Sequence, residues 1–451
     1  MHFPFNPAPR AGLALAMALA AGSGALPARA DPLDKLQAQI EALQRQIDEL
    51  KARPAAPAAP APAQAVTGGA TPGSFKLPGS DTSVTIGGYA KLDALYSSRS
   101  AGGAFPIGDQ LLVPGAIPVG PGAGNGESKE LTLHARQSRF FVRTATPSRF
   151  GPVTTLLEYD FIGSFAGDER NSSNHSPRLR HAYGSIGPLS AGQFWTNFFN
   201  EGALPETLDF GGPVGYLFVR QAQVRWTQAF DGGDWSVSAE SPESALTSGP
   251  PGGPLVGGAN GALTDDDRVP DLTARVRFKL GTANLSVAGL ARNIRFDNGT
   301  TKDSRWGGAF SLTGIVPVLG KDELRFNLNA GNVLGRYQEL GFFPDGHIDS
   351  AGELRLTPTV SGFVAYRHWW TPELRSSLVL SASQARPADA VPAGVNKEAR
   401  SAHLNLIWSP LPKVSLGGEY IHARRELTGT GGATGLSGSL NRLQLSATYN
   451  F

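Results

Sequence analysis

Apolar and polar residues alternate along most of the chain after residue 75. The last segment is the clearest example, because Leu443, Leu445 and Ala447 share one face while Arg442 and Gln444 lie on the other. Successive side chains of a strand point to opposite faces, so the alternation predicts strands with one apolar and one polar side. About 16 segments have this pattern. They cover residues 82–98, 130–146, 150–163, 176–186, 189–197, 217–230, 233–243, 270–281, 283–296, 304–316, 321–333, 357–370, 372–384, 398–410, 413–427 and 438–451.

Two architectures contain strands of this kind. A soluble sandwich buries the apolar face, whereas an outer-membrane barrel turns it to lipid and keeps the polar face for a lumen. Small residues on the apolar faces, such as Gly88, Ala90 and Ala291, would pack a two-sheet core poorly. Aromatic residues near predicted strand ends also fit the interfacial girdle of a barrel. They are Trp195, Trp306, Tyr366, Trp369, Trp370 and Trp408.

The pattern therefore predicts an all-β fold, a 16-stranded antiparallel transmembrane β-barrel over residues 75–451. An even strand number fits single-chain bacterial barrels, and a barrel of this size leaves an aqueous channel. Short turns such as Gly187-Pro188 are expected at one end, and long loops such as 99–129 and 244–269 at the other.

The first 74 residues have a different organisation. An apolar stretch at 11–26, followed by Ala28-Arg29-Ala30, predicts a secretory signal peptide over 1–30, with a membrane anchor as the alternative. Residues 54–74 are rich in Pro, Ala and Gly and predict an exposed, semi-stiff linker.

Between these parts, residues 31–53 carry apolar residues at alternating spacings of three and four. They are Leu33, Leu36, Ile40, Leu43, Ile47 and Leu50. This seam predicts a short coiled-coil segment in the periplasm, which would join subunits. The alternative is a lone amphipathic helix, because fewer than three heptads are marginal. The Ile and Leu positions nominally favour two strands, but at this length that rule does not decide the oligomeric state.

Composition and charge narrow the function. The 451 residues include 56 Gly, 34 Pro and no Cys, which argues against a helix-rich fold and excludes a disulfide scaffold and Cys-ligated metal sites. Without residues 1–30, which hold Arg10 and Arg29, the 40 basic residues fall to 38 and balance the 38 acidic ones. A neutral chain gives no support for nucleic-acid binding.

Several stretches carry a family likeness. They are 74–96 (SFKLPGSDTSVTIGGYAKLDALY), 135–140 (ARQSRF), 178–184 (RLRHAYG), 192–198 (GQFWTNF), 205–213 (PETLDFGGP) and 219–227 (VRQAQVRWT). With the heptad segment and linker, they resemble the DcaP-like outer-membrane porins. The resemblance implies a homotrimer of 16-stranded barrels, a periplasmic N-terminal coiled coil, and uptake of small organic anions such as dicarboxylates. The lipid and lipopolysaccharide of the outer membrane would surround such a barrel.

A porin needs fixed charges at a constriction rather than a nucleophile. Strand parity predicts seven arginines in the lumen, on predicted strands two, four, six and eight. They are Arg139, Arg143, Arg178, Arg180, Arg225, Arg275 and Arg277. Glu158 and Asp160 are the predicted acidic lining, while Leu179 and Tyr183 are expected on the apolar face opposite Arg178 and Arg180. Because guanidinium suits carboxylate, the hypothesis is net anion preference. The alternative is that these arginines pair with the acids and neutralise the lumen.

The loop 198–217 is the candidate constriction, since the third external loop of 16-stranded porins commonly folds inward. It contributes Glu201, Glu206 and Asp209, and its alternative is an outward surface loop.

The expected function is passive diffusion of small hydrophilic solutes, without an enzyme activity, cofactor or metal. His134 and Ser138 are about 13 Å apart along a strand, which is beyond hydrogen-bond reach for a hydrolase pair. Asp265-Asp266-Asp267 could bind a divalent cation but fits a solvated loop better. A structural or lipid-modifying barrel with a closed lumen is the alternative function.

Overall fold

The computed structural model describes ten stretches of the chain. They are residues 32–52, 67–100, 106–120, 128–163, 172–248, 266–338, 340–349, 351–387, 393–429 and 434–451. The predicted signal peptide lies outside them. The chain divides into two compact units, Met1–Gln64 and Ala65–Phe451. In the described stretches, no helix combines the length and apolar character needed to span a membrane.

The first unit contains one helix, α1 (Pro32–Ala52). The heptad residues whose side chains are described lie exposed on it, from Ile47 at 47% to Leu36 at 60%. The helix thus presents an apolar seam, as the spacing of those residues requires.

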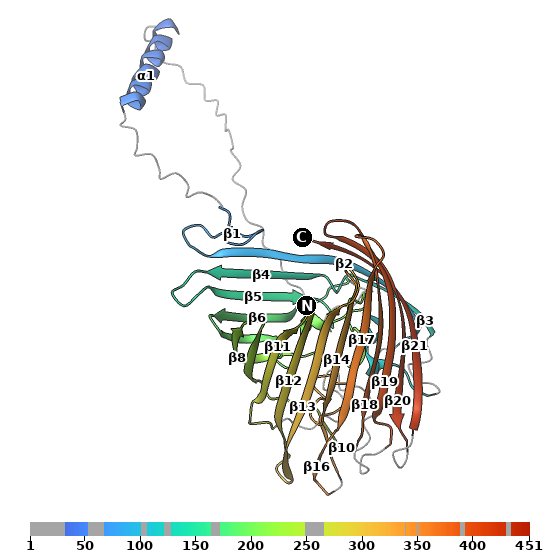
Figure 1. The fold of residues 1–451 in the computed structure, drawn as a ribbon. Helices are drawn as coiled ribbons and strands as arrows, with labels where there is room; N and C mark the ends of the chain where they lie inside the picture. Colours follow the sequence, from blue (N-terminus) through green and yellow to red (C-terminus); the bar gives the residue numbers. More distant parts are fainter. Residues whose placement is uncertain are drawn as a thin grey trace, which may run out of the picture. The chain divides into compact units, whose positions relative to one another are not determined.

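The second unit is a barrel (Figure 1). Its sheet is antiparallel, closed and 16-stranded, as the alternation predicts. β3 and β4 are the two halves of its second strand, and the short β1 (Phe75–Lys76) pairs with the start of β2. The strands are β2 (Ser83–Arg99), β3 (Ser128–His134), β4 (Arg139–Thr146), β5 (Val153–Asp160), β6 (Arg178–Ile186), β7 (Leu189–Trp195), β8 (Arg220–Phe230), β9 (Gly233–Glu240), β11 (Asp271–Leu280), β12 (Ala283–Asp297), β13 (Lys302–Pro317), β14 (Glu323–Gly331), β17 (Thr359–Trp369), β18 (Leu374–Ala385), β19 (Asn396–Leu411), β20 (Val414–Thr428) and β21 (Thr434–Asn450).

The first and last strands close the barrel. β2 pairs with β21 from Tyr89↔Asn450 to Ser97↔Arg442, and its other edge pairs with β3 and β4. Tight turns such as 187–188 and 281–282 join strands at one end, and long connections join them at the other. A small sheet of β10 (Leu246–Ser248), β15 (Gly346–Ile348) and β16 (Leu354–Leu356) belongs to the long connections.

The polar faces point inward. On β21, Arg442 and Gln444 are almost fully buried, whereas Leu443 and Leu445 are about half exposed on the outside. This arrangement is that of a barrel in lipid and the reverse of a soluble sandwich.

Three residues, Trp195, Tyr183 and Trp369, depart from the predicted faces. Trp369 shares the inner face of β17 with Arg367, and its ring lies 5.6 Å from the guanidinium carbon of Arg367 and 5.3 Å from that of Arg375. Trp195 is inside the barrel and not in an outer girdle, because its ring packs 5.1 Å from both Phe199 and Phe218. Tyr183 also points inward, where it stacks on Phe194 at 4.5 Å. The register of β5 and β6 shifts by one residue at Glu158–Tyr159, and this bulge reverses the face of the later β6 residues.

The last residues of the predicted linker 54–74 belong to the second compact unit. From residue 67, its described part is hydrogen-bonded to the barrel unit, since the Lys76 N–H donates to the Thr67 carbonyl and the Ala70 N–H to Ser83 Oγ, both at 2.9 Å.

Candidate functional site

The connection 196–219 between β7 and β8 crosses the barrel interior, and we call it the inward loop. The Leu208 N–H donates to Glu419 on β20 at 2.6 Å. The Leu208 carbonyl accepts hydrogen bonds from Lys91 Nζ on β2 at 2.7 Å and from Gln444 on β21 at 3.0 Å. Three strands far from the loop's own strands therefore hold one residue at its tip.

Glycine at position 215 lets the inward loop approach the far wall. Gly215 has a φ of +81°, and a Cβ there would lie 2.5 Å from the Ala382 carbonyl oxygen and 2.7 Å from the Gly362 nitrogen. Asn329 Nδ2 on β14 donates to the Gly215 carbonyl at 3.1 Å. Any larger residue would strain the backbone and push the loop from the wall.

The three predicted acids of the inward loop lie in different surroundings. Glu201 is exposed at the start of the short helix Glu201–Ala203. Asp209 is buried, accepts the Leu112 N–H at 3.0 Å and lies 3.7 Å from Arg442. Burial raises the pKa of Asp209.

Glu206 is the acid that joins the inward loop to a strand wall. Its carboxylate accepts two hydrogen bonds from Arg375 on β18, at 2.5 and 2.7 Å, and lies 3.5 Å from Arg367 on β17. Burial acts to raise the pKa of Glu206, but the hydrogen bonds and charge of Arg375 outweigh burial and hold the pKa below its usual range.

Six charged side chains on β4, β5, β6 and β8 form the cluster that we call the basic wall. They are Arg139, Arg178, Arg180, Arg220, Glu158 and Asp160. Arg178 pairs with Asp160 at 2.7 Å, and Arg180 bridges Glu158 at 2.6 Å and Asp160 at 2.8 Å. Arg139 lies 3.7 Å from Glu158.

Aromatic rings cover the basic wall. Phe210 of the inward loop lies 5.4 Å from the guanidinium carbons of both Arg178 and Arg180. Arg220 stacks on Trp195 at 4.4 Å and on Phe218 at 5.0 Å, and no described carboxylate lies within ion-pair distance of it. The wall therefore contains four guanidinium groups and two carboxylates, with Arg220 held by rings alone.

The other predicted arginines lie apart from this wall. Arg275 donates to the Phe199 carbonyl at 2.7 Å and so supports the inward loop. Arg225 stacks over Phe194 at 4.5 Å, and Arg143 over Phe141 at 5.7 Å. Arg277 pairs with Asp234 at 2.7 Å near a short turn. The structure thus places three of the seven predicted arginines together and distributes the other four.

A second cluster, which the sequence did not predict, faces the inward loop from the opposite side. We call it the far cluster, and it comprises Arg325, Arg367, Arg375, Glu323 and Glu206. Glu323 lies 2.5 Å from Arg325 and 3.0 Å from Arg367. Arg325 alternates with Leu324 and Phe326, a pattern that marks it as polar-facing. The inner face of β17 instead contains the buried apolar residues Phe363 and Ala365, which conceal the inward direction of Arg367.

Two further connections enter the barrel, and the polarity pattern of the sequence does not mark either of them. Within 106–120, the carbonyls of Gly108 and Gly115 each accept a guanidinium hydrogen bond at 2.6 Å, from Arg442 and Arg425 respectively. This segment packs Leu112 and Ile117 against the inner face of β19–β21. Together with the inward loop, it narrows the lumen.

The connection 332–358 is fastened by a buried ion cluster. Arg292 on β12 has no exposed surface and lies 2.6 Å from Asp345 and 3.0 Å from Asp271. The same guanidinium donates to the Val333 carbonyl at 3.0 Å, and Tyr337 donates to Asp271 at 2.9 Å. Arg292 therefore holds the connection directly at Val333 and Asp345, and Asp271 on β11 holds it at Tyr337.

The residues considered for other chemistry have structural partners. His134 Nε2 lies 3.0 Å from the Gln110 carbonyl, and Ser138 Oγ accepts the Lys91 N–H. Asp266 and Asp267 accept backbone N–H groups of β12 at 2.9 and 2.8 Å, while Asp265 is outside the described residues. Over the ranges that the structure describes, no three or more metal-ligating side chains gather.

A closed barrel with short turns, long inward connections and a charged interior defines the chain as an outer-membrane porin. A model of the DcaP outer membrane protein family matches residues 27–451, and the chain belongs to that family. The resemblance in the sequence is thereby confirmed, and the family places the protein in the bacterial outer membrane as a channel. No curated protein matches the chain.

Solved structures share the fold. The outer-membrane channel DcaP of Acinetobacter baumannii has a TM-score of 0.68 and 23% identity over 85% of this chain and 100% of that one. Outer-membrane-expressed OmpT of Vibrio cholerae has a TM-score of 0.51 and 12% identity over 83% and 99%. An anion-selective porin from Comamonas acidovorans has a TM-score of 0.50 and 14% identity over 82% and 100%.

Proposed function

We propose that the channel passes small hydrophilic solutes by passive diffusion and favours organic anions such as dicarboxylates. The observation that carries this proposal is the charge of the basic wall, where four guanidinium groups stand against two carboxylates. Complete neutralisation of the arginines, the alternative from the sequence, would need two more acids there. The far cluster also has an excess, with three arginines and two acids.

Reversal potential in a salt gradient tests this proposal directly. Purified mature protein in a planar bilayer is expected to give an anion-selective potential in potassium chloride. Added succinate should then block chloride current in a concentration-dependent way, because it occupies the same guanidinium groups. Cation selectivity would contradict the anion preference and leave the porin assignment intact.

We expect Glu206→Gln to increase anion preference about two- to threefold, because it removes one of two acids from the far cluster. The variant also loses the ionic link to Arg375. Because its pKa is lowered, ionised Glu206 stabilises the attachment of the inward loop to β18 at every pH above the usual carboxyl pKa. This stabilisation is lost as the pH falls through the lowered pKa of Glu206. Reversal potential and channel noise, recorded from neutral to acidic pH, check both effects. Unchanged selectivity together with unchanged noise would contradict this role.

A closed structural barrel is the second candidate. It is favoured by the three connections that enter the barrel and by the apolar clusters that they form with its wall. Single-channel recording separates the two functions, because a folded protein without conductance would support the closed barrel.

We also propose a homotrimer whose α1 helices lie in the periplasm and pair through their exposed apolar seam. The chain has no cysteine, so single cysteines can report the pairing without background. We expect Leu43→Cys to form interchain disulfides severalfold faster than Gln44→Cys, since only the seam brings residues of two copies close together. Equal rates would contradict a coiled coil, and native mass spectrometry counts the copies.

A further inference from the structure

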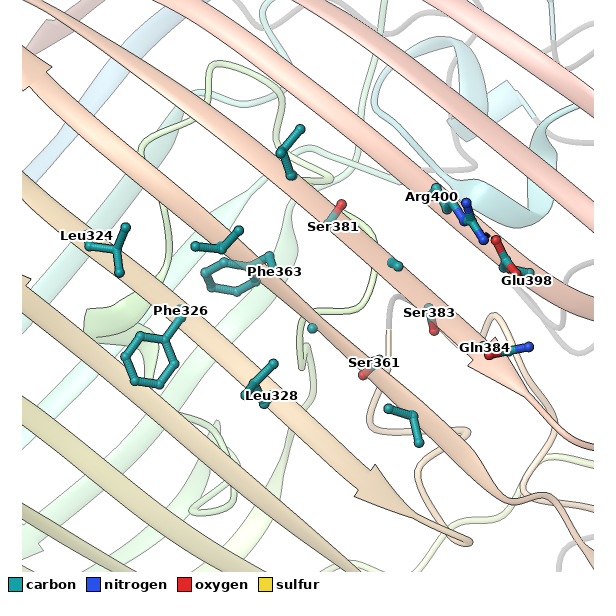
Figure 2. Close-up of a pocket in the computed structure, with 15 residues that line it drawn as sticks. Leu324, Phe326, Leu328, Ser361, Phe363, Ser381, Ser383, Gln384, Glu398 and Arg400 are labelled. Atoms are coloured by element: carbon teal, nitrogen blue, oxygen red, sulfur yellow. Dashed lines mark ion pairs between the residues drawn. The ribbon is translucent and has the colours of Figure 1, made fainter.

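An apolar groove crosses the outer face of β14, β17 and β18 and ends at β19. Its volume is about 750 Å³. Figure 2 shows the residues that line it. Strand register explains why it is hollow. Leu328 pairs with Gly362, and Gly362 pairs with Ala382. Ala382 in turn pairs with Arg400, so two almost absent side chains lie in one row between two long ones.

The groove opens toward lipid. Its walls include Leu328, Val360, Val364 and Leu380, whose exposed fractions are between 43% and 61%. These residues alternate with inward-facing ones on the same strands, so they belong to the lipid side of the barrel. No described segment of the chain covers them.

Charged residues border the groove at the end that carries the long connections. Arg400 on β19 and Arg424 on β20 are direct cross-strand neighbours, and their side chains are 68% and 50% exposed. Glu398 and Glu426 form the next row toward the long connections and pair along the strands with these arginines. Figure 2 shows Arg400 and Glu398 together at this edge of the groove.

The order of these rows matches the depth profile of an outer leaflet. Long loops of outer-membrane barrels are external, so the carboxylates lie outermost, the guanidinium groups below them, and the apolar groove deepest. Arginine near the edge of the hydrocarbon directs its guanidinium toward the headgroups and binds phosphate in a bidentate manner. A second exposed arginine, Arg386, follows the groove-lining Gln384 on β18.

We propose that this surface binds one phosphorylated glycolipid of the outer leaflet, with an acyl chain in the groove above Gly362 and Ala382 and a phosphate at Arg400 and Arg424. Neither a purely apolar occupant nor a soluble anion would use both halves of the site. The inference rests on the outer-membrane location and is independent of which solutes cross the lumen.

Native mass spectrometry of the detergent-solubilised full chain tests the site with lipid A carrying both phosphates. We expect Arg400→Gln/Arg424→Gln to reduce the bound fraction about tenfold. Ala382→Leu should reduce it as well, because the new side chain fills the groove. Dephosphorylated lipid A should bind wild-type protein as weakly as intact lipid A binds the double variant. Arg149→Gln is the matched control, since it removes an exposed arginine at a short turn.

A urea unfolding midpoint equal to that of the wild type establishes that each variant is folded, whether or not the barrel conducts. Lipid A binding that is unchanged in both groove variants would overturn the proposal. Equal binding of intact and dephosphorylated lipid A would overturn it as well. A loss of subunit association in those variants, with lipid binding retained, would assign the surface to a second copy of the chain instead.

Discussion

Arg178→Gln/Arg180→Gln is expected to abolish the anion preference of the channel. The basic wall would then contain two guanidinium groups, those of Arg139 and Arg220, against the carboxylates of Glu158 and Asp160. Two unit charges 4 Å apart interact by about 1 kcal/mol even in bulk water. Removing two guanidinium charges should therefore lower the anion-to-cation permeability ratio about tenfold or more. Reversal potentials in a potassium chloride gradient measure this ratio.

Matched variants separate this local effect from net charge. Arg149→Gln removes an arginine at an exposed turn and should leave the ratio unchanged. Arg220→Gln should produce an intermediate decrease, because Arg220 has rings as its neighbours and its loss leaves no acid unpaired. If both the double variant and Arg220→Gln keep the permeability ratio of the wild type, the selectivity arises outside the basic wall.

The largest loss of stability is expected from Arg292→Met. The substitution retains much of the side-chain volume but leaves Asp345 and Asp271 buried without their cation. Breaking a buried ion cluster in this way costs about 3–5 kcal/mol. We expect the barrel to unfold at lower urea concentration in detergent, and the connection 332–358 to become susceptible to protease before the strands do.

The neighbouring Arg295 supplies the control. It pairs with Asp297 at a partly exposed position, where an ion pair contributes at most about 1 kcal/mol. Arg295→Gln should therefore unfold close to the wild-type midpoint. Equal midpoints for Arg292→Met and wild type would mean that the connection is held by its apolar contacts alone.

The strands could be predicted because lipid and lumen impose opposite polarity on neighbouring residues. For this reason, apolar and polar residues alternate clearly along β11 and β21. Faces were wrong at Tyr183, where one extra residue in β6 reverses parity, and at Trp195, whose ring packs against the inward loop. The polarity pattern of a single sequence does not reveal a β-bulge. Residue type also does not distinguish an aromatic side chain inside the barrel from one in the outer girdle.

The site was less predictable than the fold. Polarity assigned Arg178 and Arg180 to the same face as each other, and the structure places them with Glu158 and Asp160. It could not pair Glu206 with Arg375, because 169 residues separate them and only the path of the inward loop brings them together. The same limit applies to segment 106–120, whose apolar residues resemble those of a surface loop until their partners are known.

Closure of the barrel between β2 and β21 has a consequence for biogenesis. Tyr89 pairs with Asn450 and Ser97 with Arg442, so the ladder that closes the barrel joins its first long strand to its last. Until this ladder forms, the free edges of β2 and β21 expose unpaired backbone N–H and C=O groups. Such groups are energetically costly in lipid, and they can pair with another chain and so cause aggregation. Assembly must therefore keep both edges shielded until β2 and β21 meet.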